Sequence, residues 1–159
     1  MAGHLVVEQL SLVYSSENQA DTHAFGPLSF SVAPGEFVSI VGPSGCGKSS
    51  LLECVSGLIN PTGGEAIIDG QRVGNHVPAE VGMVFQQDAS FPWLTVYDNI
   101  AFGLRYGRQT LSAEKIHMRV EEALSLVGLS EFAHHYPSQL SGGMRQRVSM
   151  ARTLVMRPQ

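Results

Sequence analysis

The residues best suited to chemistry form one loop, which reads Gly42-Pro43-Ser44-Gly45-Cys46-Gly47-Lys48-Ser49 and fits the pattern G-x-x-x-x-G-K-[ST] at every fixed position. Glycines adopt backbone conformations that are closed to residues with a Cβ, so successive N–H groups of such a loop can turn inward toward an anion. Lys48 supplies a positive charge for β- and γ-phosphates, and the Ser49 hydroxyl is a hard oxygen ligand for Mg²⁺. Together with Ser50, these residues form the predicted site for a nucleoside triphosphate and its magnesium ion.

This motif requires a strand before the loop and a helix after it. The apolar, β-branched run at residues 37–41 is too short for a helix and predicts a buried parallel strand. Apolar residues recur at helical spacing after the loop, namely Leu51, Leu52, Val55 and Leu58. Unpaired N–H groups at the start of that helix favour an anion. The alternative, a glycine-rich turn beside one surface lysine, accounts for neither flanking element.

A second helix start has the same character and lies in the run Leu140-Ser141-Gly142-Gly143-Met144-Arg145-Gln146-Arg147. Ser141 is suited to the cap position, and bare N–H groups at Gly142 and Gly143 would make another anion site. The alternative is a capped helix start with a flexible approach and no ligand. Two anion sites of this kind can share one triphosphate if two copies of the chain pack head to tail.

The remaining pattern predicts strands in the first part of the chain and helices in the second. Alternating or apolar runs predict strands at residues 5–14, 28–32 and 65–71, a polar loop at 15–23, and a further short apolar run at 81–85. Helical spacing predicts helices at residues 95–105, 112–127 and from 141 onward. We therefore expect an α/β fold with a β-rich part at residues 1–94, which carries the loop, and a helical subdomain at 95–159.

Composition limits the classes of function. At 159 residues the chain has the length of one domain, with 43% hydrophobic and 15% charged residues. A net charge of −4 disfavours non-specific nucleic-acid binding, which requires a basic face, so no nucleic-acid partner is expected. Two cysteines, Cys46 and Cys54, are too few for a disulfide framework, and Cys54 is expected to be a small buried hydrophobe. The absence of a long apolar run and of a signal-peptide pattern favours a cytoplasmic location.

The phosphate loop, the Val84-Phe85-Gln86 run and the sequence LSGGMRQRV, in this order, resemble the nucleotide-binding subunit of an ABC transporter. The resemblance covers nearly the whole chain. It implies a P-loop NTPase core with an N-terminal antiparallel β subdomain and an inserted helical subdomain, so that residues 1–159 form one ABC-type nucleotide-binding domain. The run at residues 91–96 and Met144 are similar to ATPases of importers for nitrate, sulfonates or taurine.

The resemblance also implies roles for single residues. Tyr14 would stack on adenine; the alternative for it is a strand aromatic in the core. Gln86 would be the Q-loop glutamine, which reaches Mg²⁺ or the attacking water, although Gln87 stands beside it. The signature residues Ser141, Gly142 and Gly143 would touch the γ-phosphate held by the opposite subunit of a homodimer. Met144 replaces a frequent glutamine at the fifth signature position, which is tolerable because the implied phosphate contacts come from Ser141 and backbone N–H groups.

One departure from the family lies at the C-terminus. The chain stops at Gln159, where the family continues into an apolar strand ending in Asp-Glu that supplies the Mg²⁺ aspartate and the catalytic glutamate. By this resemblance the chain is expected to be a fragment that lacks the catalytic glutamate. We expect its parent to be the ATP-hydrolysing motor of an importer, peripheral on the inner face of the membrane through permease subunits and served indirectly by a solute-binding protein. The alternatives are a nucleotide-binding module without turnover and a soluble ABC ATPase of DNA repair or translation.

Overall fold

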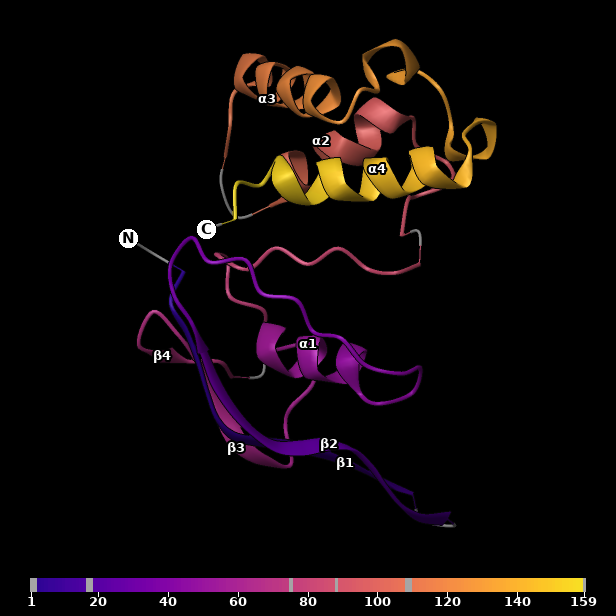
Figure 1. Ribbon diagram of the computed structural model, residues 1–159. Helices are drawn as coiled ribbons and strands as arrows, with labels where there is room; N and C mark the ends of the chain where they lie inside the picture. The colour runs from indigo at the N-terminus through magenta and orange to yellow at the C-terminus, as the bar shows by residue number, and fades with distance from the viewer. Residues whose placement is uncertain (1–2, 17–18, 75, 88, 108–109, 159) are drawn as a thin grey trace. The chain divides into compact units, whose positions relative to one another are not determined.

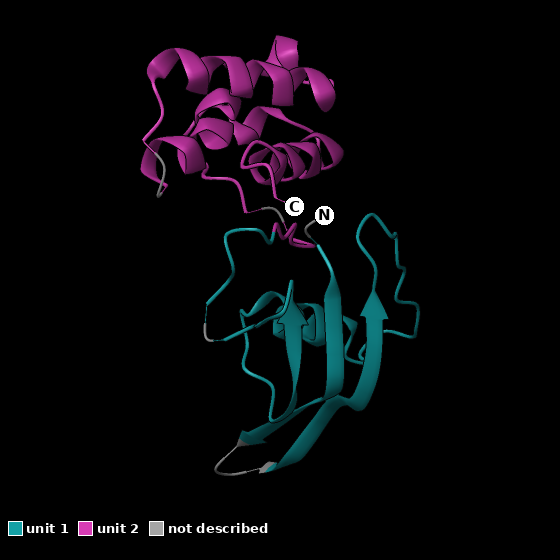
Figure 2. Cartoon of the chain, turned by 90° about the vertical axis from the view of Figure 1, so that its left-hand side faces the viewer, with its two compact units in different colours: residues 1–81, 159 teal, residues 82–158 magenta. Residues whose placement is uncertain are grey.

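The computed structural model describes residues 3–16, 19–74, 76–87, 89–107 and 110–158. The chain divides into two compact units, residues 1–81 and residues 82–158, which are coloured separately in Figure 2. The sequence predicts a boundary between a β-rich part and a helical subdomain at residues 94 and 95, and this boundary stays a prediction.

The first unit is built on an antiparallel sheet in the strand order β2-β1-β3-β4 (Figure 1). The strands are β1 Leu5–Ser16, β2 Gln19–Val32, β3 Gly63–Ile68 and β4 Gln71–Arg72. In the central strand, Val7 faces Phe30 of β2 on one side and Ala66 of β3 on the other. The predicted antiparallel N-terminal sheet is therefore confirmed.

The loop predicted at residues 15–23 is wrong for residues 15–16 and 19–23, which belong to two paired strands, while residues 17–18 lie outside the described residues. β1 continues to Ser16 and β2 begins at Gln19, with Tyr14 paired to Thr22. Tyr14 and Thr22 are exposed. Strand residues with exposed side chains need no apolar face, so this stretch lacks the alternation that identifies a half-buried strand.

Helix α1 Lys48–Ser56 packs on this sheet and closes the core of the first unit. The buried residues of that core come from both layers: Val7, Leu10, Leu12, Leu51, Cys54 and Ala66. Cys54 is buried as expected. Because the phosphate loop ends where α1 begins, the packing of α1 on the sheet fixes the direction in which the helix start points.

The buried parallel strand predicted at residues 37–41 is wrong. In this structure the segment has no strand, and the side chains of Phe37 and Val41 are each 92% exposed. The run at 81–85 has no strand either, and Val84 and Phe85 are exposed. A parallel strand requires a neighbour for its backbone ladder, and none of the described strands pairs with either segment. The apolar residues of both segments predict burial within a sheet, but they do not pack in the sheet that the described strands form.

The second unit is helical, as predicted. Its elements are α2 Val96–Tyr106, α3 Ala113–Leu126 and α4 Gly142–Leu154, with short 3₁₀ turns η1 Ser130–Phe132 and η2 Pro137–Gln139 (Figure 1). Each α-helix starts at a side-chain cap, supplied by Thr95, Ser112 and Ser141 in turn. A left-handed glycine, Gly128, follows the end of α3, as its position after the apolar pattern predicts.

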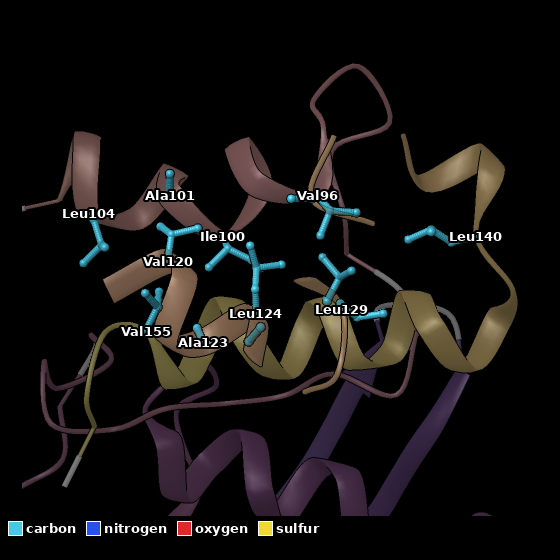
Figure 3. Packing of buried hydrophobic residues seen from close by; sticks show 13 residues of the cluster. Val96, Ile100, Ala101, Leu104, Val120, Ala123, Leu124, Leu129, Leu140 and Val155 are labelled. Carbon is cyan, nitrogen blue, oxygen red and sulfur yellow. The ribbon is translucent and has the colours of Figure 1, made fainter. Parts of the chain in front are cut away.

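The three helices share one apolar core, which is drawn in Figure 3. Residues three or four apart on each helix face inward: Val96, Ile100 and Leu104 of α2, Val120 and Leu124 of α3, and Val148 and Ala151 of α4. Full burial of one such large side chain contributes roughly 1.5–3 kcal/mol. The core therefore fixes α2 and α4 against each other. None of the described helices is both long and apolar enough to cross a lipid bilayer.

Candidate functional site

The phosphate loop turns into α1 through two left-handed glycines. Gly45 has φ +80° and Gly47, the N-cap of α1, has φ +90°. A Cβ on Gly47 would overlap the carbonyl oxygen of Ala24, whereas a Cβ on Gly45 meets nothing within 4 Å. Gly47 is therefore required both by its conformation and by the close approach of strand β2.

The side chain of Lys48 folds back over the loop. Its Nζ donates to the carbonyl oxygens of Gly42, at 2.9 Å, and Pro43, at 2.6 Å, and lies 3.6 Å from Cys46 Sγ. An ammonium group has three donors and no acceptor, so these contacts hold a positive charge above the loop. A charge in that position can bind an anionic ligand lying in the loop.

The start of α1 is open to an anion. The first intrahelical hydrogen bond runs from Leu51 N to Gly47 O at 2.8 Å, so the amides of Lys48, Ser49 and Ser50 precede the regular pattern. In the described residues no side chain caps this start, and its first turn carries no acidic residue. The positive end of the helix dipole is thus left for a ligand.

Ser49 and Ser50 place two hydroxyl groups in the first turn of α1. Ser49 is exposed, and Ser50 Oγ accepts a hydrogen bond from Tyr14 Oη at 3.3 Å. Tyr14 is 44% exposed on β1 and therefore not a core aromatic. The structure thus brings Tyr14 to the first turn of α1, while its stacking on a nucleobase stays a prediction.

The second unit holds Gln86 on an irregular segment that is bound to α4. Gln86 itself is exposed. Gln146 Nε2 donates to Phe85 O at 3.0 Å, and Thr153 Oγ1 donates to Met83 O at 3.1 Å. Neither contact was predicted from the sequence, and the signal that points to them is polar residues seven apart on one face of α4.

The segment after Gln86 is bound to the same helix. Arg152 Nη1 donates to Ala89 O, and the guanidinium carbon of Arg152 lies 4.6 Å from the ring centroid of Phe91. Phe91 in turn packs on Phe102 of α2, with ring centroids 4.6 Å apart. This combination of a charged hydrogen bond and a cation–π contact anchors the chain between α4 and α2.

Asn99 of α2 is fully buried and clamps the chain that leads into its own helix. Its Oδ1 accepts from Phe91 N at 2.8 Å, and its Nδ2 lies within 3.1 Å of the carbonyl oxygens of Phe91, Leu94 and Thr95. A buried amide of this kind fixes backbone position because each lost partner leaves an unsatisfied group. Asn99 was likewise not identified from the sequence.

We call residues 83–87 and 89–91 the Gln86 segment. A cavity of about 200 Å³ lies in the second unit between α2, α4 and this segment. Its lining includes Val84, Phe85, Phe102 and Ser149. Ser149 is 7% exposed, and its hydroxyl has no hydrogen-bond partner among the described residues. The cavity therefore combines apolar walls with one buried polar group that can bond to an incoming ligand or partner.

The signature motif opens α4. Ser141 Oγ accepts a hydrogen bond from Met144 N at 3.3 Å, and Gly142 and Gly143 are exposed. An added Cβ on Gly143 would meet nothing within 4 Å, so the helix start is open. Met144 is half-buried and packs against the apolar core of the unit. Its side chain thus serves packing, while the tolerance of this position for methionine stays a prediction.

Asp98, in the first turn of α2, has a shifted pKa. Burial, the largest single influence, raises the pKa of Asp98, but hydrogen bonds from Thr95 and Arg105 outweigh it, and the net pKa is lowered. Asp98 Oδ1 lies 2.7 Å from Arg105 Nη1, and Thr95 Oγ1 donates to Asp98 Oδ2 at 2.8 Å. The carboxylate also lies near the positive end of the α2 dipole, which favours its charged form.

The described residues include no group of three or more His, Cys, Asp or Glu side chains that could hold a metal ion by themselves. The only oxygen ligand predicted in the phosphate loop is the exposed Ser49 hydroxyl. This donor set fits Mg²⁺, which keeps most of its positions for water and substrate phosphate. Gln86, the other predicted ligand, belongs to the second unit.

Two curated proteins illustrate the relatives of this chain. The taurine import ATP-binding protein TauB of Burkholderia pseudomallei is 45% identical over 154 residues, which cover 97% of this chain and 58% of that protein. The spermidine/putrescine import ATP-binding protein PotA of Acidothermus cellulolyticus is 44% identical over 156 residues, covering 97% and 40%. The chain thus spans about half the length of the curated relatives it matches.

Solved structures share the fold. The ATP-binding cassette MJ0796, in a dimeric post-hydrolysis state bound to ADP and Pi, matches with a TM-score of 0.86 and 34% identity over 97% of this chain and 70% of that one. The predicted α/β fold of the P-loop NTPase class is confirmed by this likeness. The sequence pattern of the ABC transporter family matches residues 25–159. With the phosphate loop and the signature helix in place, this match shows that the chain belongs to the ABC transporter family.

Proposed function

We propose that this chain binds ATP with Mg²⁺ at the start of α1. The observation that carries the proposal is the phosphate loop itself: two left-handed glycines, an uncapped helix start, and the Lys48 ammonium held above the loop. The amides of the loop and the first turn would bind phosphate oxygens, and Lys48 would neutralise their charge. The binding set comprises Tyr14, Gly42, Pro43, Ser44, Gly45, Cys46, Gly47, Lys48, Ser49 and Ser50, with Tyr14 on the adenine.

The metal would be held by Ser49 and reached by Gln86. When bound, Mg²⁺ neutralises charge on the β- and γ-phosphates. Ser49 has the exposed hydroxyl that this role requires, at the residue directly after Lys48. Gln86 is exposed, and α4 binds the backbone of its neighbour Phe85, so its side chain can orient a ligand while the main chain stays fixed.

The open start of α4 supports a second nucleotide contact. In the proposed head-to-tail homodimer, Ser141, Gly142 and Gly143 of one subunit would meet the γ-phosphate bound by the other. A helix start with exposed glycines and no acidic residue in its first turn suits that role. The dimeric state of the similar cassette MJ0796 supports this arrangement.

The parent protein would be the ATP-hydrolysing motor of an importer. Relatives named as import ATP-binding proteins support this proposal. The motor would act at the inner face of the membrane, in the cytoplasm, by docking on permease subunits that receive solute from a binding protein. The cavity beside the Gln86 segment, with its apolar wall and buried Ser149 hydroxyl, is suited to receive part of a permease.

The proposed solute is nitrate, a sulfonate, taurine or a similar small solute. The likeness to TauB supports that class, and the likeness to PotA supports a polyamine as the alternative. Both relatives are named import ATP-binding proteins, which favours a transporter over a soluble ABC ATPase of another process. The acidic net charge of −4 also argues against a nucleic-acid partner.

The experiment that tests the dimer and the hydrolysis uses the full-length gene product. Ser141→Arg places a bulky cation at the start of α4, where it opposes the helix dipole and crowds the open face. Light scattering with Mg-ATP and a phosphate-release assay should show loss of both the ATP-dependent dimer and hydrolysis. The matched control is Ser125→Arg, which changes an exposed serine of α3 and should leave both unchanged.

Two results would contradict the proposal. One is an ATP-dependent dimer with normal hydrolysis in Ser141→Arg, because the signature start would then not contact the shared nucleotide. The other is ATP binding by the unsubstituted protein without phosphate release, with or without permease. That result would favour the alternative of a nucleotide-binding module without turnover.

A further inference from the structure

Side chains of α4 bind the main chain on both sides of Gln86. Gln146 and Thr153 donate to carbonyl oxygens that precede it, and Arg152 donates to one that follows it. All of these residues belong to the unit formed by residues 82–158. We call Gln146, Arg152 and Thr153 the α4 donors.

The α4 donors act on carbonyl groups, so they fix the path of the main chain whatever side chains the segment carries. This leaves the Gln86 side chain exposed, between anchored flanks. On the far flank, Asn99 binds Phe91 through both its backbone N–H and its carbonyl, which ties the segment to α2 as well. Residues 83–87 and 89–91, the part of this segment that the structure describes, form no helix or strand, so these contacts set their conformation.

Helix α4 is a rigid support for this arrangement. It has 13 residues, which corresponds to a length of about 20 Å. Val148 and Ala151 are fully buried in the core, so α4 is packed between its two ends. The helix starts at Ser141 and binds the Gln86 segment along its length. A displacement of the signature start therefore moves the backbone that carries Gln86.

We infer that the α4 donors are positioning residues that couple the signature motif to the Gln86 segment. They hold this segment on α4, so that contact of Ser141 with a nucleotide sets the position of Gln86. This inference rests on the proposed function, because it assigns the donors a part in ATP hydrolysis. They touch no reacting atom and act through Gln86.

Two substitutions remove a donor and keep the size of the side chain. Thr153→Val deletes the hydroxyl that binds Met83, and Gln146→Met deletes the amide that binds Phe85. Thr153→Ser keeps a hydroxyl and serves as the conservative variant. Thr62→Val is the matched control, since Thr62 Oγ1 donates to Ser11 O at 3.1 Å in the other unit.

The first readout is limited proteolysis of the full-length gene product by chymotrypsin, which cuts after exposed aromatic residues such as Phe85. Thr153→Val and Gln146→Met should raise the rate of cleavage after Phe85 by about five- to tenfold, because one hydrogen bond that holds this segment on α4 is lost. Cleavage within α2 and α3 should stay at its original rate, which shows that the unit remains folded. Thr153→Ser should restore resistance to cleavage after Phe85, and Thr62→Val should leave that cleavage unchanged.

The second readout separates kcat from KM. The double variant Gln146→Met/Thr153→Val should lower kcat for ATP by about tenfold and leave the KM for ATP within twofold, because the phosphate loop is untouched. Thr153→Ser should keep kcat near that of the unsubstituted protein. A side chain with only a structural role would not produce faster cleavage after Phe85 together with an isolated loss of kcat.

Three results would overturn the inference. Unchanged cleavage after Phe85 in both single variants would show that the donors do not hold the segment. Faster cleavage with unchanged kcat would show that the coupling has no part in hydrolysis. If the unsubstituted protein binds no ATP and releases no phosphate, the proposed function fails, and the coupling to hydrolysis fails with it, whatever the cleavage rates show.

Discussion

The phosphate loop depends on single residues whose backbone geometry few other residues can adopt. Gly47 is left-handed and lies against the carbonyl of Ala24, whereas Gly45 is left-handed in open space. A comparison of the two glycines therefore separates two free-energy costs of adding a Cβ: the left-handed conformation, at both positions, and steric overlap, at Gly47 alone. Lys48 depends on both, because its ammonium reaches the carbonyls of the loop only if the loop keeps this turn.

Gly47→Ala should destabilise the protein more than Gly45→Ala. A left-handed residue with a Cβ costs roughly 1–2 kcal/mol, so Gly45→Ala should lose about that much. Gly47→Ala must also displace the Ala24 backbone, which typically costs a further ~1–3 kcal/mol. Urea unfolding of the full-length gene product measures both. Equal losses in the two variants would show that the close approach of β2 does not constrain Gly47.

The sequence identified the phosphate-loop pattern, because that pattern is local and each fixed position has its own chemical reason; the binding roles of its residues stay predictions. It did not predict that Lys48 binds the carbonyls of Gly42 and Pro43, or that Tyr14 bonds to Ser50. Those contacts depend on how far a side chain reaches and on strand register. The α4 donors were missed for a similar reason, since their partners lie more than sixty residues away in the chain.

At the scale of elements, α2 is defined by interactions at its start. Thr95 caps the helix, Asp98 completes the cap from the first turn, and Asn99 binds the chain that leads in. The predicted helix boundaries were close because caps and apolar spacing are local signals. The strand predicted at residues 37–41 was wrong because a parallel strand depends on neighbouring strands that an apolar run does not reveal.

Asn99→Ala should destabilise the second unit strongly. The substitution leaves Phe91 N–H and the Leu94 carbonyl without the buried partner that each has now. Because unsatisfied buried groups cost about 1–3 kcal/mol each, the expected loss is about 2–4 kcal/mol in the free energy of unfolding. The control Asn60→Ala changes an exposed residue and should stay within about 0.5 kcal/mol. A loss below about 1 kcal/mol for Asn99→Ala would rule out the clamp.

The Asp98 carboxylate should make stability depend on acid pH. Its pKa in the folded protein is lowered, so the charged carboxylate stabilises the fold above the ordinary aspartate pKa of 3.8. That stabilisation is lost as the pH falls through the lowered pKa. Asp98→Asn should therefore reduce Tm at pH 7, and the difference from the unsubstituted protein should shrink toward pH 3. A difference in Tm that is equal at both pH values would contradict this account.

At the scale of the whole molecule, the chain presents two helix starts that suit an anion, one in each unit. The start of α1 follows the phosphate loop, and the start of α4 follows Ser141. In the proposed dimer, which family membership supports, the start of α1 in one copy and the start of α4 in the other contact the same nucleotide. Binding at α1 comes first in that scheme, because the signature start has nothing to contact until a triphosphate is held.

Calorimetric titration of Mg-ATP into the full-length gene product tests that step most directly. The account predicts saturable binding of one ATP per chain, and loss of binding by at least about tenfold in Lys48→Ala, because the phosphates lose their charge partner. Lys115→Ala, which changes an exposed lysine of α3, is the matched control and should bind as the unsubstituted protein does. Equal affinity in Lys48→Ala and the unsubstituted protein, or no binding by either, would contradict the assignment of the loop.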